Sequence, residues 1–463
     1  MAGRPDRVVK AGRAAWLFFF LSLLVYQANL RPVAPSDSIP AALLPFAVVL
    51  DGSLALDRFG PWLNQALPAS QVFLHRKDGH YYSWYPVGQP LLLVPAYAPL
   101  VRAAGAGSLS IPELVLFARI LEKLFAATLA AATVAAFFVL ARRLTRSGVA
   151  WMAGAAFAFA TPVWSIHSQA LWQHTGGGLL IVLALLGFAR WSGSPDRVRL
   201  LALAGLCSGL ALAVRPTNAI FAAAMAAVLL IRRRGWRAIA AYLAPPAVCG
   251  LMTAALNLHL FGDLRGGYAL PLNPRWGEGV AGLLFSPGRG LFVYCPFLLL
   301  AVPGYFVWRR REEPYRSLAT VGALFCGGHL LVAAVSPAWW GGTCWGPRLM
   351  SETVPFLVLF TIPAMERLAG SSAGLKGAFA ALLAWSIFLQ AVGAFCYPRG
   401  YWDDVPRSSR SAPERMWDWR DNPVRRTLGG GLVWEPYVVA AEALLHGKAA
   451  ALEKMKQFGM RGF

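Results

Sequence analysis

Apolar runs of about 20 residues recur along this chain, and short connections rich in arginine separate them. A helix of roughly 20 apolar residues spans a hydrocarbon layer about 30 Å thick. Charged residues make up only 14% of the chain, whereas soluble domains carry about 25%. The runs and the low charge content together predict an all-α polytopic membrane protein, and they argue against a soluble domain.

Eleven of these runs predict eleven transmembrane helices. The predicted spans cover 14–30, 115–141, 148–164, 172–190, 199–213, 217–231, 238–258, 291–308, 317–335, 350–366 and 375–396. The first span follows a basic stretch and lacks a small-residue cleavage site. We therefore expect it to stay in the protein as a membrane span rather than to be removed as a signal peptide.

The distribution of Lys and Arg predicts how these spans are oriented. If the N-terminus is cytoplasmic, the connections on that side carry twenty Lys and Arg residues, against five in the short connections on the other side. Positively charged connections stay in the cytoplasm, so we expect a cytoplasmic N-terminus and a location in the cell inner (plasma) membrane. These clusters account for most of the net charge of +21, and we expect no nucleic-acid partner.

Two segments on the opposite, periplasmic side are long. The first, 31–114, contains apolar stretches at 41–50 and 90–101, which are too short to cross a membrane and predict helices in its interface. The second, 398–463, ends in an amphipathic stretch and predicts a small periplasmic tail with one amphipathic helix. We therefore divide the chain into a transmembrane domain, 1–397, and this tail.

Nearly all the unusual polar motifs fall on the predicted periplasmic side. They are PSDS (35–38), YSWYPVGQP (82–90), SQALWQHT (168–175), RPTN (215–218), LFSPGRG (284–290) and WWGGTCWGPR (339–348). Ionisable groups at bilayer depth are energetically costly and usually face a cavity or a partner. Because the cytoplasmic connections are short and mostly basic, we expect an active site on the periplasmic side.

Two arginines on this side have surroundings that suit a phosphate. Arg289 lies between glycines, near the hydroxyl of Ser286, and precedes a span that begins on the periplasmic side. Arg348 opens the following span of this kind in the same way. The positive end of a helix and a guanidinium both attract phosphate oxygens. The alternatives are contacts with lipid headgroups for both arginines and a pair between Arg348 and Glu352, four residues on.

A second group of charged residues lies at the periplasmic end of the second span. Arg119, Glu122 and Lys123 share roughly one face of that helix, so Arg119 and Glu122 could form a structural pair while Lys123 binds a phosphate. Arg215 lies at the turn between two short spans, where it is either a loop cap or another phosphate ligand. We include these three cations among the candidate phosphate ligands.

Gln173 and His174 open the fourth span on the periplasmic side and could donate hydrogen bonds to a sugar hydroxyl or a phosphate. A lone histidine is often a structural group instead, and this alternative holds more strongly for His167. Tyr85 and the tryptophans at this level could hold sugar rings, although they also fit an aromatic belt at the membrane interface.

Asp37 lies seven residues past the first predicted span, in a loop bounded by proline and serine. A carboxylate at the membrane interface can act as a general base toward a hydroxyl or an amine. Asp37 could also cap the helix predicted to begin near Ile39. The two roles are compatible.

The sequence predicts neither a metal ion nor another cofactor. Asp403 and Asp404 have no His or Cys residues at ligand spacing, so we interpret them as solvated acids. Six cysteines are too few for a disulfide framework. The cysteines near span ends, where one disulfide is left open, are Cys295, Cys344 and Cys396.

The first span followed by an outward acidic residue (Asp37), the Tyr85-Pro86-Val87-Gly88-Gln89-Pro90 motif in a long outer loop, and Arg119 at the outer end of the second span resemble the GT-C superfamily of membrane glycosyltransferases. The plan is similar to that of the bacterial aminoarabinose–lipid A transferases and the protein O-mannosyltransferases. The resemblance covers most of 1–397 as architecture and only these three features as residues. The acidic pair common in that superfamily is Asp37-Ser38 here, so a metal is not expected.

The resemblance implies an inverting glycosyltransferase that moves a sugar from a polyprenyl-phosphate donor to a lipid, glycan or protein of the cell envelope, with Asp37 as the base. The residues expected near the donor phosphate are Arg289, Arg348, Arg119, Lys123 and Arg215. Those expected near the sugar or the acceptor are Gln173, His174, Tyr85, Ser286 and Glu352. The alternatives are a transporter or flippase of lipid-linked sugars, which the lack of an internal repeat disfavours, and a non-catalytic subunit of an envelope-assembly complex.

Overall fold

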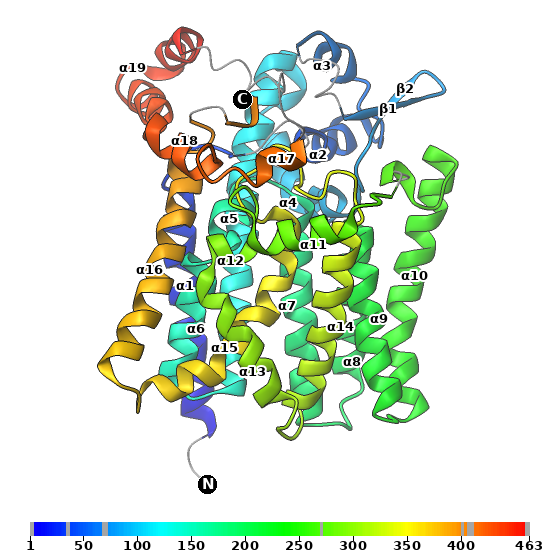
Figure 1. Ribbon diagram of the computed structural model, residues 1–463. Coiled ribbons are helices and arrows are strands. Elements are labelled where there is room, and N and C mark those ends of the chain that lie inside the picture. Colours follow the sequence, from blue (N-terminus) through cyan, green and yellow to red (C-terminus); the bar gives the residue numbers. More distant parts are fainter. Residues whose placement is uncertain are drawn as a thin grey trace.

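The computed structural model describes residues 4–33, 38–66, 73–268, 272–399, 402–404 and 412–458, and helices make up most of them (Figure 1). The first elements are α1 (Arg4–Gln27), α2 (Ile39–Asp51), α3 (Gly60–Ala66), β1 (Leu74–Lys77), β2 (His80–Ser83), α4 (Gly88–Ala103), η3 (Ala106–Ser108), α5 (Ile111–Leu144), α6 (Ser147–Phe159), η4 (Val163–His167), α7 (Gln173–Ser192) and α8 (Arg199–Val214). The middle elements are η5 (Pro216–Asn218), α9 (Ala219–Ile231), α10 (Trp236–Phe261), η6 (Gly266–Tyr268), α11 (Trp276–Phe285), α12 (Leu291–Tyr294), η7 (Pro296–Leu300), α13 (Ala301–Trp308) and α14 (Tyr315–Ala334). The last are η8 (Arg348–Thr353), α15 (Val354–Leu368), α16 (Ala373–Phe395), η9 (Trp402–Asp404), α17 (Ala412–Met416), α18 (Pro423–Gly430) and α19 (Glu435–Gln457).

Six helical segments in the described part of the chain are long and apolar enough to cross a membrane. They are Ile111–Leu144, Gln173–Ser192, Trp236–Phe261, Tyr315–Ala334, Arg348–Leu368 and Ala373–Phe395. The prediction of a nearly all-α chain is confirmed, and these helices indicate a multi-pass membrane protein. The other predicted spans coincide with shorter apolar helices at Gly12–Gln27, Ser147–Phe159, Arg199–Val214, Pro216–Ile231 and Pro296–Trp308. The total of eleven crossings stays a prediction.

Glycines let several of these helices pack at backbone distance. A Cβ atom at Gly205 of α8 would lie 2.2 Å from the carbonyl oxygen of Tyr242 in α10. One at Gly304 of α13 would lie 1.6 Å from the carbonyl oxygen of Phe360 in α15. Contacts through small residues are typical of helices that associate within a membrane, where the apolar surroundings provide little hydrophobic driving force.

The arginine-rich connections gather at one end of the helix bundle, at the bottom of Figure 1. Thr145, which follows α5, donates to Glu366 in α15 at 2.7 Å, and Arg311, which follows α13, donates to the other oxygen of that carboxylate at 2.8 Å. Arg234 lies over the ring of Trp191 at 5.2 Å, so the connection after α9 lies beside the end of α7. We name this the basic end. The polar motifs that the structure describes lie toward the opposite, upper end.

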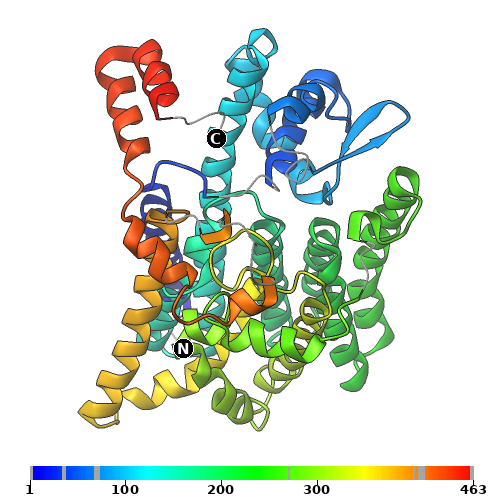
Figure 2. The same ribbon diagram turned by 45° about the horizontal axis from the view of Figure 1, so that its top comes forward.

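A layer of short elements covers the upper end (Figures 1 and 2). It contains α2 and α4, which pack against each other and confirm that the stretches 41–50 and 90–101 form helices. It also contains an antiparallel hairpin of β1 and β2, which we did not predict. The hairpin turns at Asp78-Gly79, with φ of 52° and 87°. This residue pair is a strong signal for a tight hairpin turn.

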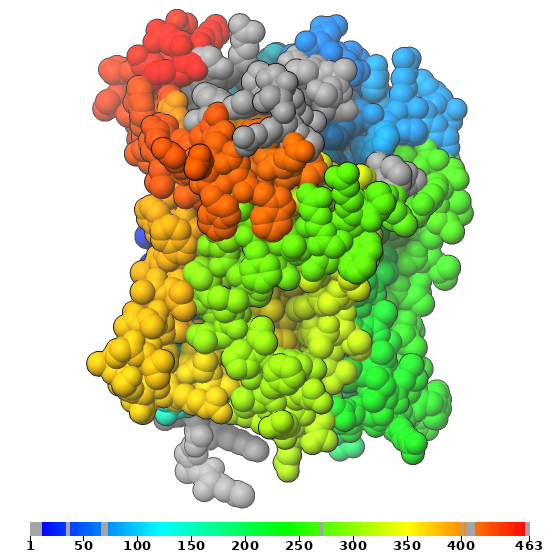
Figure 3. Space-filling view, viewed as in Figure 1, coloured from blue at the N-terminus to red at the C-terminus, as the bar shows by residue number. Residues whose placement is uncertain are grey.

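The C-terminal tail lies across the same end, where Figure 3 shows α17 and α18 above α11 and α16. The predicted amphipathic helix is present as α19, but it bends at Gly447, whose φ is 83°. Lys448 at the bend forms an ion pair with Glu113 at the start of α5, with 3.0 Å between nitrogen and oxygen. The two ends of α19 return toward each other, because Trp434 contacts Phe458 with 5.3 Å between ring centroids.

Candidate functional site

The chain between α6 and α7 leaves the helical conformation inside the bundle. After α6 it forms the π-helical turn η4 and then runs without regular structure until α7 begins at Gln173. Every residue from 160 to 172 is buried. Irregular backbone at membrane depth is tolerated only where protein surrounds it or where it lines a cavity. The motif SQALWQHT, 168–175, therefore lies in a protein environment at the upper part of the bundle.

Polar side chains from four other elements gather around this motif. We name the motif together with these side chains the polar hub. The side chains are Gln89 of α4; Arg119, Glu122 and Lys123 of α5; Arg215 and Asn218 at the two ends of the turn that contains η5; and Arg348 and Glu352 of η8. Five of the predicted site residues are thus brought to the motif that contains Gln173 and His174: Arg119, Lys123, Arg215, Arg348 and Glu352.

On the α5 side, the hub contains the predicted structural pair. Arg119 forms an ion pair with Glu122 and donates a hydrogen bond to Ser38 Oγ at 3.1 Å. Glu122 accepts a hydrogen bond from the backbone N–H of Leu171 at 3.0 Å. Both charged side chains are buried. The pair therefore joins α5 to the start of α2 and to the motif.

Lys123, one residue further, has different partners. Its ammonium donates to the carbonyl oxygen of Ser168 at 3.1 Å and to Oε1 of Gln169 at 2.8 Å. Within the described residues it makes no ion pair, although the side chain is buried. Lysines are almost never fully buried unless they are paired. Lys123 is therefore a buried lysine whose hydrogen-bond partners among the described residues are both neutral oxygens.

On the α7 side, Glu352 is bound from three directions. Arg215 forms an ion pair with its Oε2, and Asn218 donates to its Oε1 at 2.9 Å. His174 Nδ1 lies 3.3 Å from Oε2 and 2.9 Å from Nη1 of Arg215. Nδ1 of His174 donates to Glu352 in one tautomer and accepts from Arg215 in the other, so it contacts both members of the ion pair. Among the described residues, Nε2 of His174 has no hydrogen-bond partner.

Three consecutive glycines at the start of α7 allow this approach. A Cβ atom at Gly176 would lie 2.5 Å from Oε1 of Gln89, and one at Gly177 would lie 2.4 Å from Oε1 of Glu352. Gln89 accepts from the backbone N–H of Gly176 at 2.7 Å and donates to the carbonyl oxygen of Leu171 at 2.9 Å. The three glycines, which follow Gln173, His174 and Thr175 in α7, thus form a surface without side chains against which polar groups of the hub pack.

Arg348 contacts the motif through a cation–π interaction with the ring of Trp172. Its guanidinium carbon lies 4.1 Å from the ring centroid of Trp172, the residue before α7. It also donates to the carbonyl oxygen of Gly341, and it is only half-buried. Arg348 thus fixes the loop 339–347 against the start of α7.

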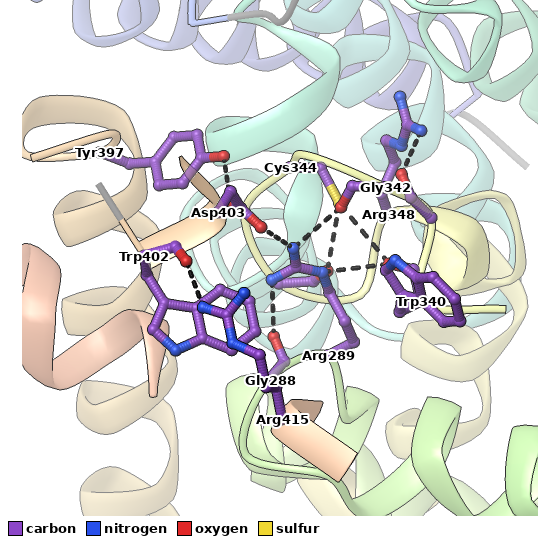
Figure 4. A network of polar contacts seen from close by, with 12 residues as sticks. Gly288, Arg289, Trp340, Gly342, Cys344, Arg348, Tyr397, Trp402, Asp403 and Arg415 are labelled. Atoms are coloured by element: carbon purple, nitrogen blue, oxygen red, sulfur yellow. Dashed lines mark hydrogen bonds and ion pairs between the residues drawn. The ribbon is translucent and has the colours of Figure 1, made fainter. Parts of the chain in front are cut away.

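Arg289 lies at a second site, which Figure 4 shows in close view. Its guanidinium donates to the carbonyl oxygens of Trp340, Gly288 and Gly342 at 2.9 to 3.0 Å and to Oδ1 of Asp403 at 2.8 Å. The side chain is fully buried. We name Arg289, its carbonyl partners and Asp403 the arginine anchor. It joins three segments: the SPGRG loop, the loop 339–347 and η9 of the tail.

Asp403 is ion-paired in this anchor and its side chain is only 10% exposed, so our interpretation of Asp403 as a solvated acid is wrong. Its Oδ2 accepts from the hydroxyl of Tyr397 at 2.6 Å. Burial and then the neighbouring Asp403 carboxylate raise the pKa of Tyr397 well above its usual range, so Tyr397 acts as a proton donor in this bond. The pattern of the sequence could not indicate this role, because Arg289 and Asp403 lie far apart along the chain.

The remaining predicted residues lie apart from the hub or outside the described residues. Asp37 lies outside them, whereas Ser38 is described and accepts from Arg119. Tyr85 lines a small cleft between the loop 83–87 and the end of α10. Ser286 belongs to the anchor loop, where its Oγ accepts from the backbone N–H of Arg289 at 3.1 Å.

The six cysteines are all free thiols, so the disulfide that we left open is not formed. Within the part of the chain that the structure describes, no group of three or more His, Cys, Asp or Glu side chains is arranged to hold a metal ion. Neither a scan of protein-family models nor a search of curated proteins gave a match for this chain.

Three residues of the site were missed in the sequence. Gln89, Asn218 and Gln169 each bridge two segments of the hub. All three lie in motifs that we had singled out, and the run of three glycines at the start of α7 was the available signal for close approach by other groups.

Proposed function

We propose that this protein is a GT-C type glycosyltransferase of the inner membrane, which moves a sugar from a polyprenyl-phosphate donor to an acceptor of the cell envelope. The observation that carries the proposal is that Lys123 of the polar hub is buried and has no anionic partner among the described residues. A buried ammonium that only two neutral oxygens hold is poorly compensated. An anionic ligand would compensate it, and a lipid-linked phosphate is an anion that can reach a site among membrane helices.

Lys123 and Arg348 are the cations that we assign to the donor phosphate. Arg348 lies against Trp172, the N-cap of α7, and the N-terminal end of a helix attracts anions. Arg119 and Arg215 are ion-paired with Glu122 and Glu352, and we assign them the role of holding the hub in place. Charge develops on the phosphate as the bond to the sugar breaks, so cations fixed there stabilise the transition state more than the ground state.

We assign the base to Asp37. Its neighbour in the sequence, Ser38, accepts a hydrogen bond from Arg119 of the hub. In the proposed reaction, Asp37 accepts the proton of the acceptor hydroxyl as its oxygen attacks the anomeric carbon. The bond between that carbon and the phosphate oxygen breaks, and the electron pair leaves with the phosphate. A single displacement of this kind inverts the anomeric carbon, through a transition state with oxocarbenium character.

The separation of the basic end from the hub supports an active site on the periplasmic side. Connections rich in arginine favour the cytoplasm, and the hub lies toward the other end of the bundle (Figure 1). A donor attached to a membrane lipid suits that side, because nucleotide sugars are confined to the cytoplasm.

The contacts of Arg289 favour a structural role over phosphate binding. Its guanidinium already binds three carbonyl oxygens and one carboxylate, and the side chain is 0% exposed. We therefore leave Arg289 and Ser286 out of the proposed donor site. Gln173 and His174 stay assigned to the sugar or the acceptor, because both belong to the motif at the centre of the hub.

The experiment is sugar transfer by the purified protein in proteoliposomes. Undecaprenyl phosphate carrying a radiolabelled sugar is the donor, and an extract of envelope lipids and glycans is the acceptor pool. Asp37→Asn should lower transfer by about 100-fold or more, as expected for loss of a general base, with donor affinity within about twofold of the wild type. Asp57→Asn is the matched control, because Asp57 pairs with His80 in the upper layer, at 2.6 Å, and should leave transfer unchanged.

Two outcomes would contradict the proposal. Transfer that survives Asp37→Asn would remove Asp37 as the base. Movement of the intact donor between leaflets, without sugar transfer to any acceptor, would instead support the transporter.

A further inference from the structure

His167, at the end of η4, is a buried histidine whose side chain has no hydrogen-bond partner among the described residues. It is 1% exposed, and neither Nδ1 nor Nε2 is bonded. The backbone holds this position firmly, because the carbonyl oxygen of His167 accepts from the hydroxyl of Thr175 at 2.8 Å. A buried polar group without a partner calls for an explanation such as a bound ligand or an ordered water.

The ring of His167 lies against the hub. It is nearly parallel to the ring of His174, with an interplanar angle of 12° and 6.3 Å between centroids. A Cβ atom at Gly178 would lie 3.0 Å from its Cε1 and 3.1 Å from its Nδ1. The glycine surface of α7 therefore fixes the imidazole beside the group of His174, Arg215 and Glu352.

The chemistry of the unbonded atoms indicates what they would bind. A neutral imidazole presents one donor and one acceptor. A phosphate oxygen satisfies only the donor and an ammonium only the acceptor, whereas a pair of hydroxyl groups satisfies both. The group with the right chemistry for His167 is therefore a neutral polyhydroxyl compound.

Neighbouring groups in the hub have the same mixed character. Among the residues that the structure describes, Nε1 of Trp172 is a buried donor without a partner, and Oδ1 of Asn218 is a buried acceptor without one. Nε2 of His174 adds a further ring nitrogen without a hydrogen-bond partner among the described residues, a donor or an acceptor according to the tautomer. The carboxylate of Glu352 is occupied by Arg215 and Asn218. The hub thus presents neutral donors and acceptors at the start of α7, besides the cations assigned to phosphate.

We infer that His167 binds sugar hydroxyl groups, and that the polar hub contains a sugar subsite for a neutral polyhydroxyl sugar, with His174 as the second imidazole. The inference rests on the proposed function and names the chemical class of the sugar that the donor carries. His167 would determine binding of the sugar, while Lys123 and Arg348 would determine binding of the phosphate.

The test compares lipids with and without a sugar. Undecaprenyl phosphate and its glucosyl, mannosyl and arabinosyl derivatives are titrated into the purified, full-length protein in nanodiscs. In the wild type, at least one sugar-bearing lipid should bind more tightly than undecaprenyl phosphate. His167→Phe should raise the Kd of that lipid about tenfold, the effect expected for loss of hydrogen bonds to one side chain. The Kd of undecaprenyl phosphate should stay within about twofold.

Two further variants control for packing. His167→Asn keeps one donor group and one acceptor and should retain part of the tighter binding of the sugar-bearing lipid. If His167 only fills space, His167→Asn should bind that lipid no better than His167→Phe does. His80→Phe replaces an exposed histidine of the hairpin and should leave both affinities unchanged.

The outcomes distinguish this inference from the proposed function. If the wild type binds none of these lipids, the proposed donor site and the sugar subsite are both overturned. If undecaprenyl phosphate binds but no sugar derivative binds more tightly, only the sugar subsite is overturned. The sugar subsite is also overturned if His167→Phe still binds the sugar-bearing lipid more tightly than undecaprenyl phosphate by the full wild-type factor, as expected when only an ordered water bonds His167. It is likewise overturned if His167→Phe raises the Kd of both lipids by the same factor.

Discussion

The polar hub and the arginine anchor are two buried charged sites at the same end of the bundle, and both hold the loop 339–347. In the anchor, Arg289 binds three carbonyl oxygens and the carboxylate of Asp403. Among the described residues, Lys123 of the hub has only neutral hydrogen-bond partners, and the ring of His167, which lies against the hub, has none. A network whose polar groups are satisfied internally rigidifies a fold, whereas groups left unsatisfied suit a ligand. The two sites therefore differ in function, although both contain the arginines that first suggested phosphate binding.

The largest expected effect is on stability, at the anchor. Arg289→Met would leave the carboxylate of Asp403 and three carbonyl oxygens without their donor, so the free energy of unfolding should fall by about 5 kcal/mol, at the upper end of the range for a broken buried pair. Thermal unfolding in detergent measures the loss. Arg275→Met, at an exposed position before α11, is the control and should change little. Donor affinity that fell along with stability would contradict the separation of the two sites.

Glu352→Gln should destabilise the hub by a smaller amount. Gln keeps the shape and one acceptor, but it leaves the buried Arg215 without its counter-charge, so we expect a loss of about 3 kcal/mol. The control is Glu366→Gln at the basic end, where the carboxylate is partly exposed and a loss below about 1 kcal/mol is expected. Equal losses in the two variants would mean that the hub is no more tightly coupled than a surface cluster.

Lys123→Met should weaken binding rather than stability. A charge-assisted hydrogen bond contributes about 2 kcal/mol, so the Kd for undecaprenyl phosphate should rise roughly 30-fold. The free energy of unfolding should change little, because the variant also removes the cost of burying an unpaired ammonium. Lys448→Met, at the exposed bend of α19, is the control for charge alone. A large loss of stability with unchanged affinity would make Lys123 a structural residue like Arg289.

The sequence was sufficient to predict the helices and the separation of the basic connections from the polar motifs. Both depend on local composition: an apolar run is a property of neighbouring residues, as is a cluster of arginines. The motif at 168–175 was also recognised, because unusual polar residues gathered on the predicted periplasmic side of the apolar runs. The hairpin was missed although its signal, Asp78-Gly79 between strand-like residues, was present.

The difference between the two arginine sites could not be predicted in this way. The partner of Arg289 is 114 residues away, and that of Arg215 is 137 residues away. Only the fold decides which acid meets which arginine, and therefore which cation is neutralised. The sequence around Arg289, a glycine-rich loop before a helix, was more typical of phosphate binding, yet groups of the protein accept the hydrogen bonds of this guanidinium. Lys123, on a helix without such a pattern, is buried and makes no ion pair with a residue in the described part of the chain.

The smallest expected effect compares two tryptophans that lie under arginines. Trp172→Leu removes the ring beneath Arg348, where the guanidinium carbon is 4.1 Å from the ring centroid. A partly buried cation–π contact contributes up to about 1 kcal/mol, so the Kd for undecaprenyl phosphate should rise by about fivefold as Arg348 loses its fixed position. Trp402→Leu removes the corresponding ring at the anchor, where Arg289 lies at 5.4 Å and Arg415 at 4.5 Å, and should leave that Kd unchanged. Equal changes in the two variants would place the phosphate between the sites, in contact with the loop 339–347 that they share, and Arg289 would return to the donor site.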